Sequence, residues 1–318
     1  MTALQKQGMK DLILDLQGNG GGYLNAAIDL ANEFLGQKEL IVYTEGRTAQ
    51  RSEFFAKGNG DFRTGRLIVL VDEYTASASE IVSGAVQDWD RGIIVGRRSF
   101  GKGLVQRPID LPDGSMIRLT IARYYTPAGR CIQKPYDSST DYNKDLIERF
   151  NHGELMNADS IHFPDSLKVQ TKKLKRTVYG GGGIMPDYFV PIDTTLYTDY
   201  HRNLVGKGVI IKFTMKFIED HRKELTDKYK KFEHFNEKFI IDDDMLATLR
   251  EMGEKEGVKF NEEQYQKSLP LIKTQLKALI ARDLWDMNEY FRVMNATNES
   301  VQKALEILRS GEYQKKLK

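Results

Sequence analysis

The first 135 residues alternate between short apolar runs and longer segments whose apolar residues recur at helical spacing. The apolar runs, each typical of a buried strand, are residues 12–16 (LILDL), 40–44 (LIVYT), 66–72 (RLIVLVD) and 92–96 (GIIVG). Helices are predicted between them, over residues 23–35 and 77–89. Such alternation with short connections predicts an α/β fold with a mainly parallel sheet and flanking helices.

A hairpin is predicted after the last of these strands. Residues 103–111 and 115–125 have period-two patterns and flank a turn that contains Asp113 and Gly114. In sheets of parallel strands, functional sites form at the carboxyl ends of the strands. Three polar or glycine-rich segments follow predicted strands and are therefore the places to look for chemistry: residues 18–22, 74–79 and 99–103.

The second half of the chain has a different pattern. Residues 136–194 are irregular, and from about residue 200 onward Lys, Glu, Phe and Leu recur at helical periods. We therefore predict an α/β core over residues 1–194 and a helical C-terminal extension over residues 195–318. The charged faces of the extension are expected to be solvated and not to form a binding patch.

Composition excludes several classes of protein. The net charge is +2, from 47 basic and 45 acidic residues, so a nucleic-acid partner is not expected. Hydrophobic residues make up 40% of the chain, as in soluble globular proteins, and no apolar run approaches the ~20 residues that a membrane helix needs. Residues 1–16 do not have the pattern of a secretory signal, so the chain is expected to be cytoplasmic or to begin inside a longer protein.

Residues that could bind a metal are scattered. The single cysteine, Cys131, excludes a cysteine cluster, and no H-E-x-x-H pattern occurs. We therefore predict neither a metal nor a cofactor. The α/β core also has no histidine in its first 150 residues, so a nucleophile there would need a different base or a histidine from the tail.

The first candidate is Ser77, in the segment TASASE, where a strand gives way to a helix. Unpaired amides and the positive end of the helix dipole stabilise an alkoxide and an oxyanion at such a position. The alternative is structural, because Ser77 and Glu80 match the capping box S-x-x-E, and capping is the commoner use of such serines.

The second candidate is Lys102, in the segment SFGKG. Its surroundings resemble a phosphate-binding loop, but Gly103 stands where magnesium binding needs Ser or Thr, and a hairpin follows in place of a helix. Lys102 could simply be a surface lysine beside a turn. If it were desolvated among small residues, its neutral amine could take a proton from a serine, and Gln106, on the same face of a strand, could orient that amine.

The third candidate is the glycine loop QGNGGG, residues 17–22. Its glycines allow close backbone approach and could present an N–H group to an oxyanion, although the loop could also be only a tight connection. Each of the three segments alone is a weak signal. Together they supply a nucleophile, a base and oxyanion donors at neighbouring strand ends, as acyl transfer requires.

These segments resemble the carboxyl-terminal processing peptidases, also called tail-specific proteases. The resemblance covers about residues 5–190 and includes the spacing from Ser77 to Lys102 and from Lys102 to Gln106. The matching stretches are LILDLQGNGGG, TASASEIVSGAVQDW, GRRSFGKGLVQ, RLTIARYYTPAGR and GGGGIMPD. The PDZ domain that usually precedes the catalytic half in this family is not recognisable here.

The resemblance implies a ClpP/crotonase-like protease core and a set of roles. Ser77 would be the nucleophile, Lys102 the general base and Gln106 its orienting partner, while the backbone N–H groups of Ala78 and Gly21 would form the oxyanion hole. The activity implied is that of a serine endopeptidase that cleaves proteins near disordered C-terminal tails through an acyl-enzyme. A non-catalytic peptide- or ligand-binding member of the same fold is the alternative.

The resemblance also implies where the protein works and with what. Its partners would be protein or peptide substrates, and the helical extension could form a homo-oligomer. Its location would be the periplasm or cell envelope, although no export signal is visible in the sequence.

Overall fold

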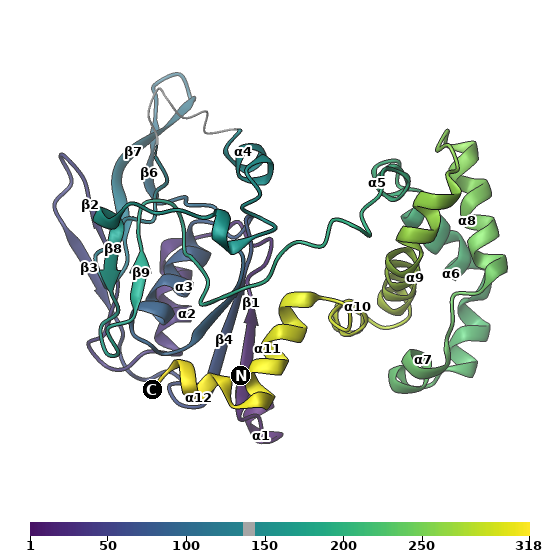
Figure 1. Cartoon of the computed structure of the whole chain (residues 1–318), viewed down its shortest axis with the longest axis horizontal. Helices are drawn as coiled ribbons and strands as arrows, with labels where there is room; N and C mark the ends of the chain where they lie inside the picture. The colour runs from purple at the N-terminus through teal and green to yellow at the C-terminus, as the bar shows by residue number, and fades with distance from the viewer. Residues whose placement is uncertain (136–143) are drawn as a thin grey trace. The chain divides into compact units, whose positions relative to one another are not determined.

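The computed structural model describes residues 1–135 and 144–318, which form two compact units. The first unit contains residues 1–191 and 303–318, and the second contains residues 192–302 (Figure 1). The helices of the first unit before the second unit begins are α1 (Thr2–Lys6), α2 (Leu24–Asn32), α3 (Ala78–Asp88) and α4 (Asp145–Asn151). Its strands are β1 (Asp11–Asp15), β2 (Leu40–Glu45), β3 (Ser52–Phe55), β4 (Arg66–Val71), β5 (Ile93–Gly96), β6 (Leu104–Asp110), β7 (Met116–Tyr125), β8 (Lys168–Gln170), β9 (Thr177–Tyr179) and β10 (Tyr188–Phe189).

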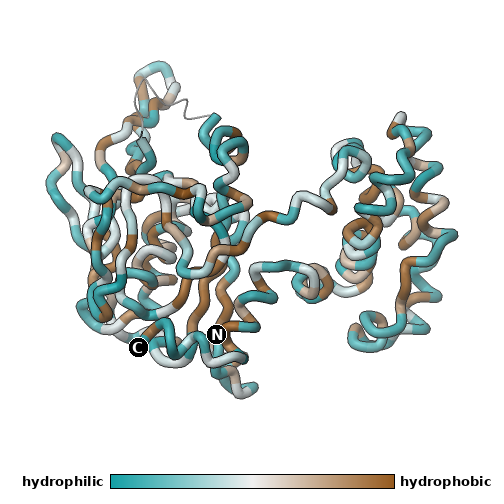
Figure 2. Tube along the Cα trace, viewed as in Figure 1, coloured by the Kyte–Doolittle hydropathy of each residue, from teal (hydrophilic) through white to brown (hydrophobic). Residues whose placement is uncertain are grey.

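A four-stranded parallel sheet forms the centre of the first unit, in the order β1-β4-β5-β10. Its central strand β4 has five consecutive apolar residues, 67–71, that are all fully buried (brown in Figure 2). A continuous apolar run of this kind is expected where both faces of a parallel strand are covered. Helix α3 contacts β5 on one side and β2 of a second sheet on the other.

The second sheet is antiparallel, in the order β3-β2-β7-β6. The fold prediction was therefore only partly correct, because residues 40–44 belong to this sheet and not to the parallel one. A short loop joins β2 to β3, and such a loop permits only antiparallel pairing, whereas parallel strands need a long crossover. The predicted hairpin is confirmed as β6 and β7, whose turn is held by bonds from Ser115 to the Asp113 carboxylate.

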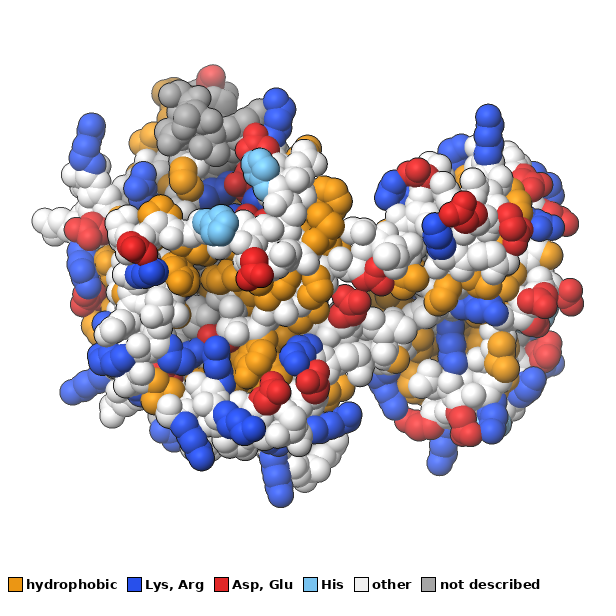
Figure 3. All heavy atoms as spheres, viewed as in Figure 1, with side chains coloured by type: hydrophobic (Ala, Val, Ile, Leu, Met, Phe, Trp, Pro, Cys, Tyr) orange, Lys and Arg blue, Asp and Glu red, His pale blue; other side chains and the backbone are white. Residues whose placement is uncertain are grey.

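Helices are the only regular secondary structure among the described residues of the second unit, as the periodicity predicted. Its helices are α5 (Asp199–Gly206), α6 (Val209–Lys228), α7 (Phe232–Lys238), α8 (Asp243–Lys255), α9 (Glu262–Leu284) and α10 (Met287–Met294). Helix α9 packs against α5, α6 and α10, and the apolar stripes of these helices form a separate core. On the face shown in Figure 3, acidic and basic side chains are interspersed over this unit without a patch of one sign.

The last residues of the chain return to the first unit. Helix α11 (Glu299–Ser310) leads into α12 (Glu312–Lys316), and residues 303–318 pack with the α/β core, whereas the sequence pattern grouped all of residues 195–318. Arg66 donates to the Leu308 carbonyl at 2.5 Å, and the Tyr313 hydroxyl accepts from the Leu67 N–H at 2.9 Å. These bonds attach the end of the chain to the start of β4. None of the helices described is long and apolar enough to cross a membrane.

Candidate functional site

Ser77 lies at the junction of β4 and α3, where it is the N-cap residue of the helix. Its backbone has φ 57° and ψ −117°, a conformation that residues other than glycine rarely adopt. Backbone strain of this kind costs on the order of 1–3 kcal/mol and is concentrated at functional sites. The Ser77 side chain is partly exposed, whereas its helical neighbours Ala78 and Ser79 are buried. The junction therefore presents one serine at the start of a buried helix.

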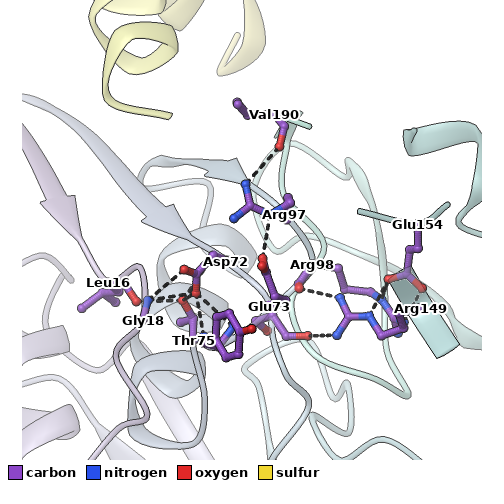
Figure 4. Close-up of polar contacts among 12 residues, drawn as sticks. Leu16, Gly18, Asp72, Glu73, Thr75, Arg97, Arg98, Arg149, Glu154 and Val190 are labelled. Carbon is purple, nitrogen blue, oxygen red and sulfur yellow. Dashed lines mark hydrogen bonds and ion pairs between the residues drawn. The ribbon is translucent and has the colours of Figure 1, made fainter. Parts of the chain in front are cut away.

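The carboxylate of Asp72 fixes the loop before Ser77 to the glycine loop (Figure 4). It accepts from the Gly18 N–H at 2.9 and 3.0 Å and from the Thr75 N–H at 2.9 Å. The Thr75 hydroxyl in turn donates to the Leu16 carbonyl at 2.7 Å. Asp72, Thr75 and Leu16 are buried, whereas Gly18 is exposed, so a largely buried set of hydrogen bonds holds the ends of β1 and β4 together.

The glycine loop approaches the N-terminus of α3 at Gly21. A Cβ atom on Gly21 would lie 2.6 Å from the Ala76 carbonyl oxygen and 2.7 Å from the Ala78 nitrogen, and φ is +88°. Both facts require glycine at this position. The structure therefore brings together the backbones of Gly21 and Ala78, the two residues predicted to form the oxyanion hole.

The Gly21 N–H has a partner within the loop. It donates to the side-chain oxygen of Asn19 at 2.9 Å, and the same oxygen accepts from the Ser79 hydroxyl, also at 2.9 Å. The Asn19 carbonyl accepts from the Ala76 N–H at 3.0 Å. Asn19 thus connects the glycine loop to Ser79 of helix α3 and to Ala76 just before the helix, and an oxyanion at Gly21 would have to displace the Gly21–Asn19 bond.

Glu80 joins the Ser77 helix to the segment that contains Lys102. One carboxylate oxygen, Oε2, accepts from the N–H groups of Ser77 and Lys102, each at 2.8 Å. The other oxygen accepts from the Ser99 hydroxyl at 2.6 Å and from the Gly101 N–H at 2.7 Å. The side chain is fully buried, and this burial raises the pKa of Glu80 while the four donated bonds oppose the rise. The two nitrogens on Oε2 can be no more than twice 2.8 Å apart, so the backbones of Ser77 and Lys102 are neighbours.

Two ion pairs anchor the backbone that leads to Lys102 (Figure 4). Arg97 pairs with Glu73 at 2.6 Å, and Arg98 pairs with Glu154 at 2.6 Å. Arg149 shares the Glu154 carboxylate at 2.8 Å and donates to the Arg98 carbonyl at 2.7 Å. All five side chains are largely buried, so these ion pairs and hydrogen bonds hold the backbone before Lys102 in a defined position.

Lys102 and Gln106 line one open cavity of about 1000 Å³. Lys102 precedes β6, and Gln106 lies within it, just after a bulge at Val105. Both side chains are exposed, whereas the sequence analysis considered a lysine desolvated among small residues. Among the hydrogen bonds of the described residues, none joins the Ser77 hydroxyl to the Lys102 amine. Catalytic contacts are often looser before substrate binds, so the backbone arrangement is the relevant observation.

Sequence reasoning did not assign a functional part to Asp72, Asn19 or Glu80. Glu80 was noted only as half of a capping box, and it does accept from the Ser77 N–H, but three further donors also converge on it. Asp72 could have been singled out from the sequence because it is a polar residue directly after a buried strand. Among the described residues, no group of three or more His, Cys, Asp or Glu side chains could hold a metal ion.

Comparisons with known proteins match two separate parts of the chain, one within each unit. Residues 1–140 match the model of peptidase family S41, and residues 200–286 match a family of unknown function (DUF8443). The chloroplastic C-terminal processing peptidase of Tetradesmus obliquus is 44% identical over 133 residues, which are 42% of this chain and 28% of that protein. The carboxyl-terminal-processing protease of Synechocystis sp. is 47% identical over 132 residues, or 41% of this chain and 30% of that protein.

The chain therefore matches less than a third of the length of these curated relatives. Among solved structures, a photosystem II D1 C-terminal processing protease is 31% identical with a TM-score of 0.43. That alignment covers 61% of this chain and 38% of the other.

Proposed function

We propose, from the premise that residues 1–140 belong to peptidase family S41, that this chain carries the catalytic site of a serine endopeptidase with a Ser77/Lys102 dyad. The observation that supports the dyad most directly is the shared carboxylate oxygen of Glu80, which brings the Ser77 and Lys102 backbones together. The adjacent Gly21 and Ala78 backbones supply the second requirement, donors for a developing oxyanion.

In the proposed reaction, the Ser77 hydroxyl oxygen attacks a peptide carbonyl carbon while the neutral Lys102 amine takes the hydroxyl proton. The N–H groups of Ala78 and Gly21 stabilise the tetrahedral oxyanion, and Gly21 exchanges its bond to Asn19 for one to the substrate. Collapse breaks the C–N bond, and the Lys102 ammonium protonates the leaving amine. Water then attacks the acyl-enzyme, Lys102 takes a proton from it, and the Ser77 hydroxyl is restored.

Gln106 would orient the Lys102 amine from the same cavity. Because Lys102 is exposed, water must leave the cavity before the amine can act as a base, and a bound substrate chain would displace that water. Such a chain could pair with β6, which is an edge strand of the antiparallel sheet. Main-chain pairing accepts disordered segments with few sequence demands, and C-terminal tails are the substrates that we propose.

The test is labelling with a serine-reactive fluorophosphonate, followed by digestion of a protein with a disordered tail. We expect wild type to be labelled and to cut, and Ser77→Ala to do neither. Ser52→Ala, which changes an exposed serine on β3, is the matched control and should behave as wild type. Lys102→Ala should lose cleavage, because the proposed proton acceptor is removed.

Cleavage that survives Lys102→Ala would remove the proposed base. Binding of the tail without labelling or cleavage in wild type would favour a non-catalytic peptide-binding protein. From the family resemblance we also propose a location in the periplasm or cell envelope, which cell fractionation with an antibody to this chain would test.

A further inference from the structure

The cavity that contains Lys102 and Gln106 has an uneven distribution of charge. Three basic residues line it, Arg47, Lys102 and Arg123, against one acidic residue, Glu45. The other lining side chains are polar or apolar, with Leu104, Ile121 and Tyr125 among the apolar ones. A chain that enters the cavity therefore meets an excess of positive charge on a partly apolar wall.

Among the described residues, the two arginines of the cavity have no carboxylate partner. Other arginines of the first unit are paired with carboxylates, as in Arg66 with Asp11 and Arg130 with Asp88. Arg47 and Arg123 are both exposed, and within the described part of the chain neither forms an ion pair or a hydrogen bond. Their guanidinium groups are free to bind a ligand.

Strand pairing places Arg123 toward the cavity. Arg123 on β7 stands opposite Glu45 on β2 and opposite Leu104 on β6, and all three line the cavity. Tyr125, two residues further on the same face of β7, stacks on Tyr43 with 4.8 Å between the ring centroids. The position of the Arg123 backbone is thus set by a paired strand, while Arg47 follows β2 in the adjoining loop.

We infer that this cavity selects substrates with a carboxylate close to the bond that is cut, and that Arg47 and Arg123 are the specificity-determining residues. The inference rests on the proposed peptidase function. A guanidinium binds a carboxylate with two parallel hydrogen bonds. An amide or an ammonium group of the substrate, in place of the carboxylate, cannot accept both of these bonds. The carboxylate is either an Asp or Glu side chain of the substrate or the free C-terminus of the tail.

The experiment uses a disordered peptide that wild type cuts, in variants that carry Glu, Gln or Lys at one position at a time along the sequence. Each variant is made with a free C-terminal carboxylate and with an amide, so that the two sources are separated. We expect kcat/KM for the best Glu peptide or for the free C-terminus to exceed that of its neutral counterpart about tenfold, and the advantage to shrink in high salt.

Variants of the protein then assign the preference to the two arginines. Arg47→Gln with Arg123→Gln should bring the ratio of acidic to neutral peptide close to one, and Arg123→Glu should favour the Lys peptide. The matched control is Arg118→Gln, which changes an exposed arginine on β7 outside the cavity lining and should keep the wild-type ratio. A side-chain carboxylate is the source if amidation has no effect, and the C-terminus is the source if amidation alone abolishes the preference.

Fluorescence anisotropy with labelled peptides and Ser77→Ala makes the inference testable apart from catalysis. If wild type cuts no peptide but Ser77→Ala still binds acidic peptides best, the peptidase proposal fails and the carboxylate selectivity stands. Equal cleavage and equal binding of the Glu, Gln and Lys series, within twofold, would overturn the selectivity while leaving the peptidase proposal intact.

Discussion

The backbone N–H groups of Ser77 and Lys102 donate to the same oxygen of one buried carboxylate, Glu80 Oε2. Ser77 begins helix α3, and Lys102 lies in the segment after β5, so the two residues come from separate turns of the fold. A single side chain thus holds the backbones of the two proposed catalytic residues close together. The other oxygen of Glu80 accepts from the Ser99 hydroxyl and the Gly101 N–H, which holds the segment just before Lys102.

Glu80→Gln should abolish cleavage and lower stability. The amide has one acceptor oxygen, and its NH₂ group would face N–H donors, so at least one buried bond is lost. Bonds to charged groups contribute about 1.5–3 kcal/mol each, and we expect the free energy of unfolding to fall by at least that amount. Urea unfolding and fluorophosphonate labelling measure the two effects, with Glu148→Gln, an exposed carboxylate on α4, as control. Wild-type labelling of Glu80→Gln would show that the carboxylate does not position the site.

Gly21→Ala should remove activity and destabilise the first unit. Its Cβ would lie 2.6 Å from a backbone oxygen, and the backbone there cannot move without moving Ser77. Gly114→Ala is the matched control, because Gly114 also has a positive φ but no atom lies within 4 Å of its added Cβ. Both variants place alanine at a positive φ, so a difference between them measures the steric clash at Gly21 and not the backbone strain. Equal melting temperatures for the two variants would contradict the close approach of Gly21 to α3.

Asn19→Asp should slow the reaction and leave the fold intact. The carboxylate would hold the Gly21 N–H more strongly than the amide does and would place negative charge beside the oxyanion. We expect kcat to fall by about 10²-fold, the loss seen when one oxyanion donor is removed. Steady-state kinetics measure the fall, and circular dichroism checks the fold. An unchanged kcat would mean that Gly21 is not an oxyanion donor, and another amide of the loop would take that role.

Tyr200 should make the second unit sensitive to alkali. Burial in the helical core raises the pKa of Tyr200 from its ordinary value of 10.0 to about 12. The folded state favours the neutral phenol. Tyr200 therefore contributes to the free energy of unfolding below pH 10, and this contribution is lost as the pH rises toward 12. The loss should be roughly 2–3 kcal/mol, because each pKa unit corresponds to about 1.4 kcal/mol.

Thermal unfolding between pH 8 and pH 12 measures this loss. Tyr200→Phe should flatten the alkaline decline of the helical unit, whereas Tyr23→Phe, at an 86% exposed tyrosine, should not. Equal declines in wild type and Tyr200→Phe would rule out Tyr200 as the group responsible.

The features predicted well from sequence are those that a local pattern determines. The buried run before Asp72, the hairpin at Asp113 and the glycine loop at Gly21 each depend on residues close together in the chain. The assignment of residues 40–44 to the parallel sheet was wrong, because one apolar strand fits either sheet and only its partners distinguish them. The contacts of Glu80 could not be predicted from the sequence either. Three of its four donors come from residues 99–102, and no local sequence pattern indicates which carboxylate those residues contact.

Tyr313 accepts the Leu67 N–H, although 246 positions separate the two residues. The first unit is therefore discontinuous in the chain, and its closing piece follows the whole of the second unit. During synthesis from the N-terminus, the α/β unit emerges long before the helices that complete it, and the helical unit emerges between them. The Leu67 N–H at the start of β4 then cannot donate to the Tyr313 hydroxyl until the last helices leave the ribosome. Folding order on the ribosome thus makes completion of the proposed catalytic unit depend on a segment that contributes none of its catalytic groups.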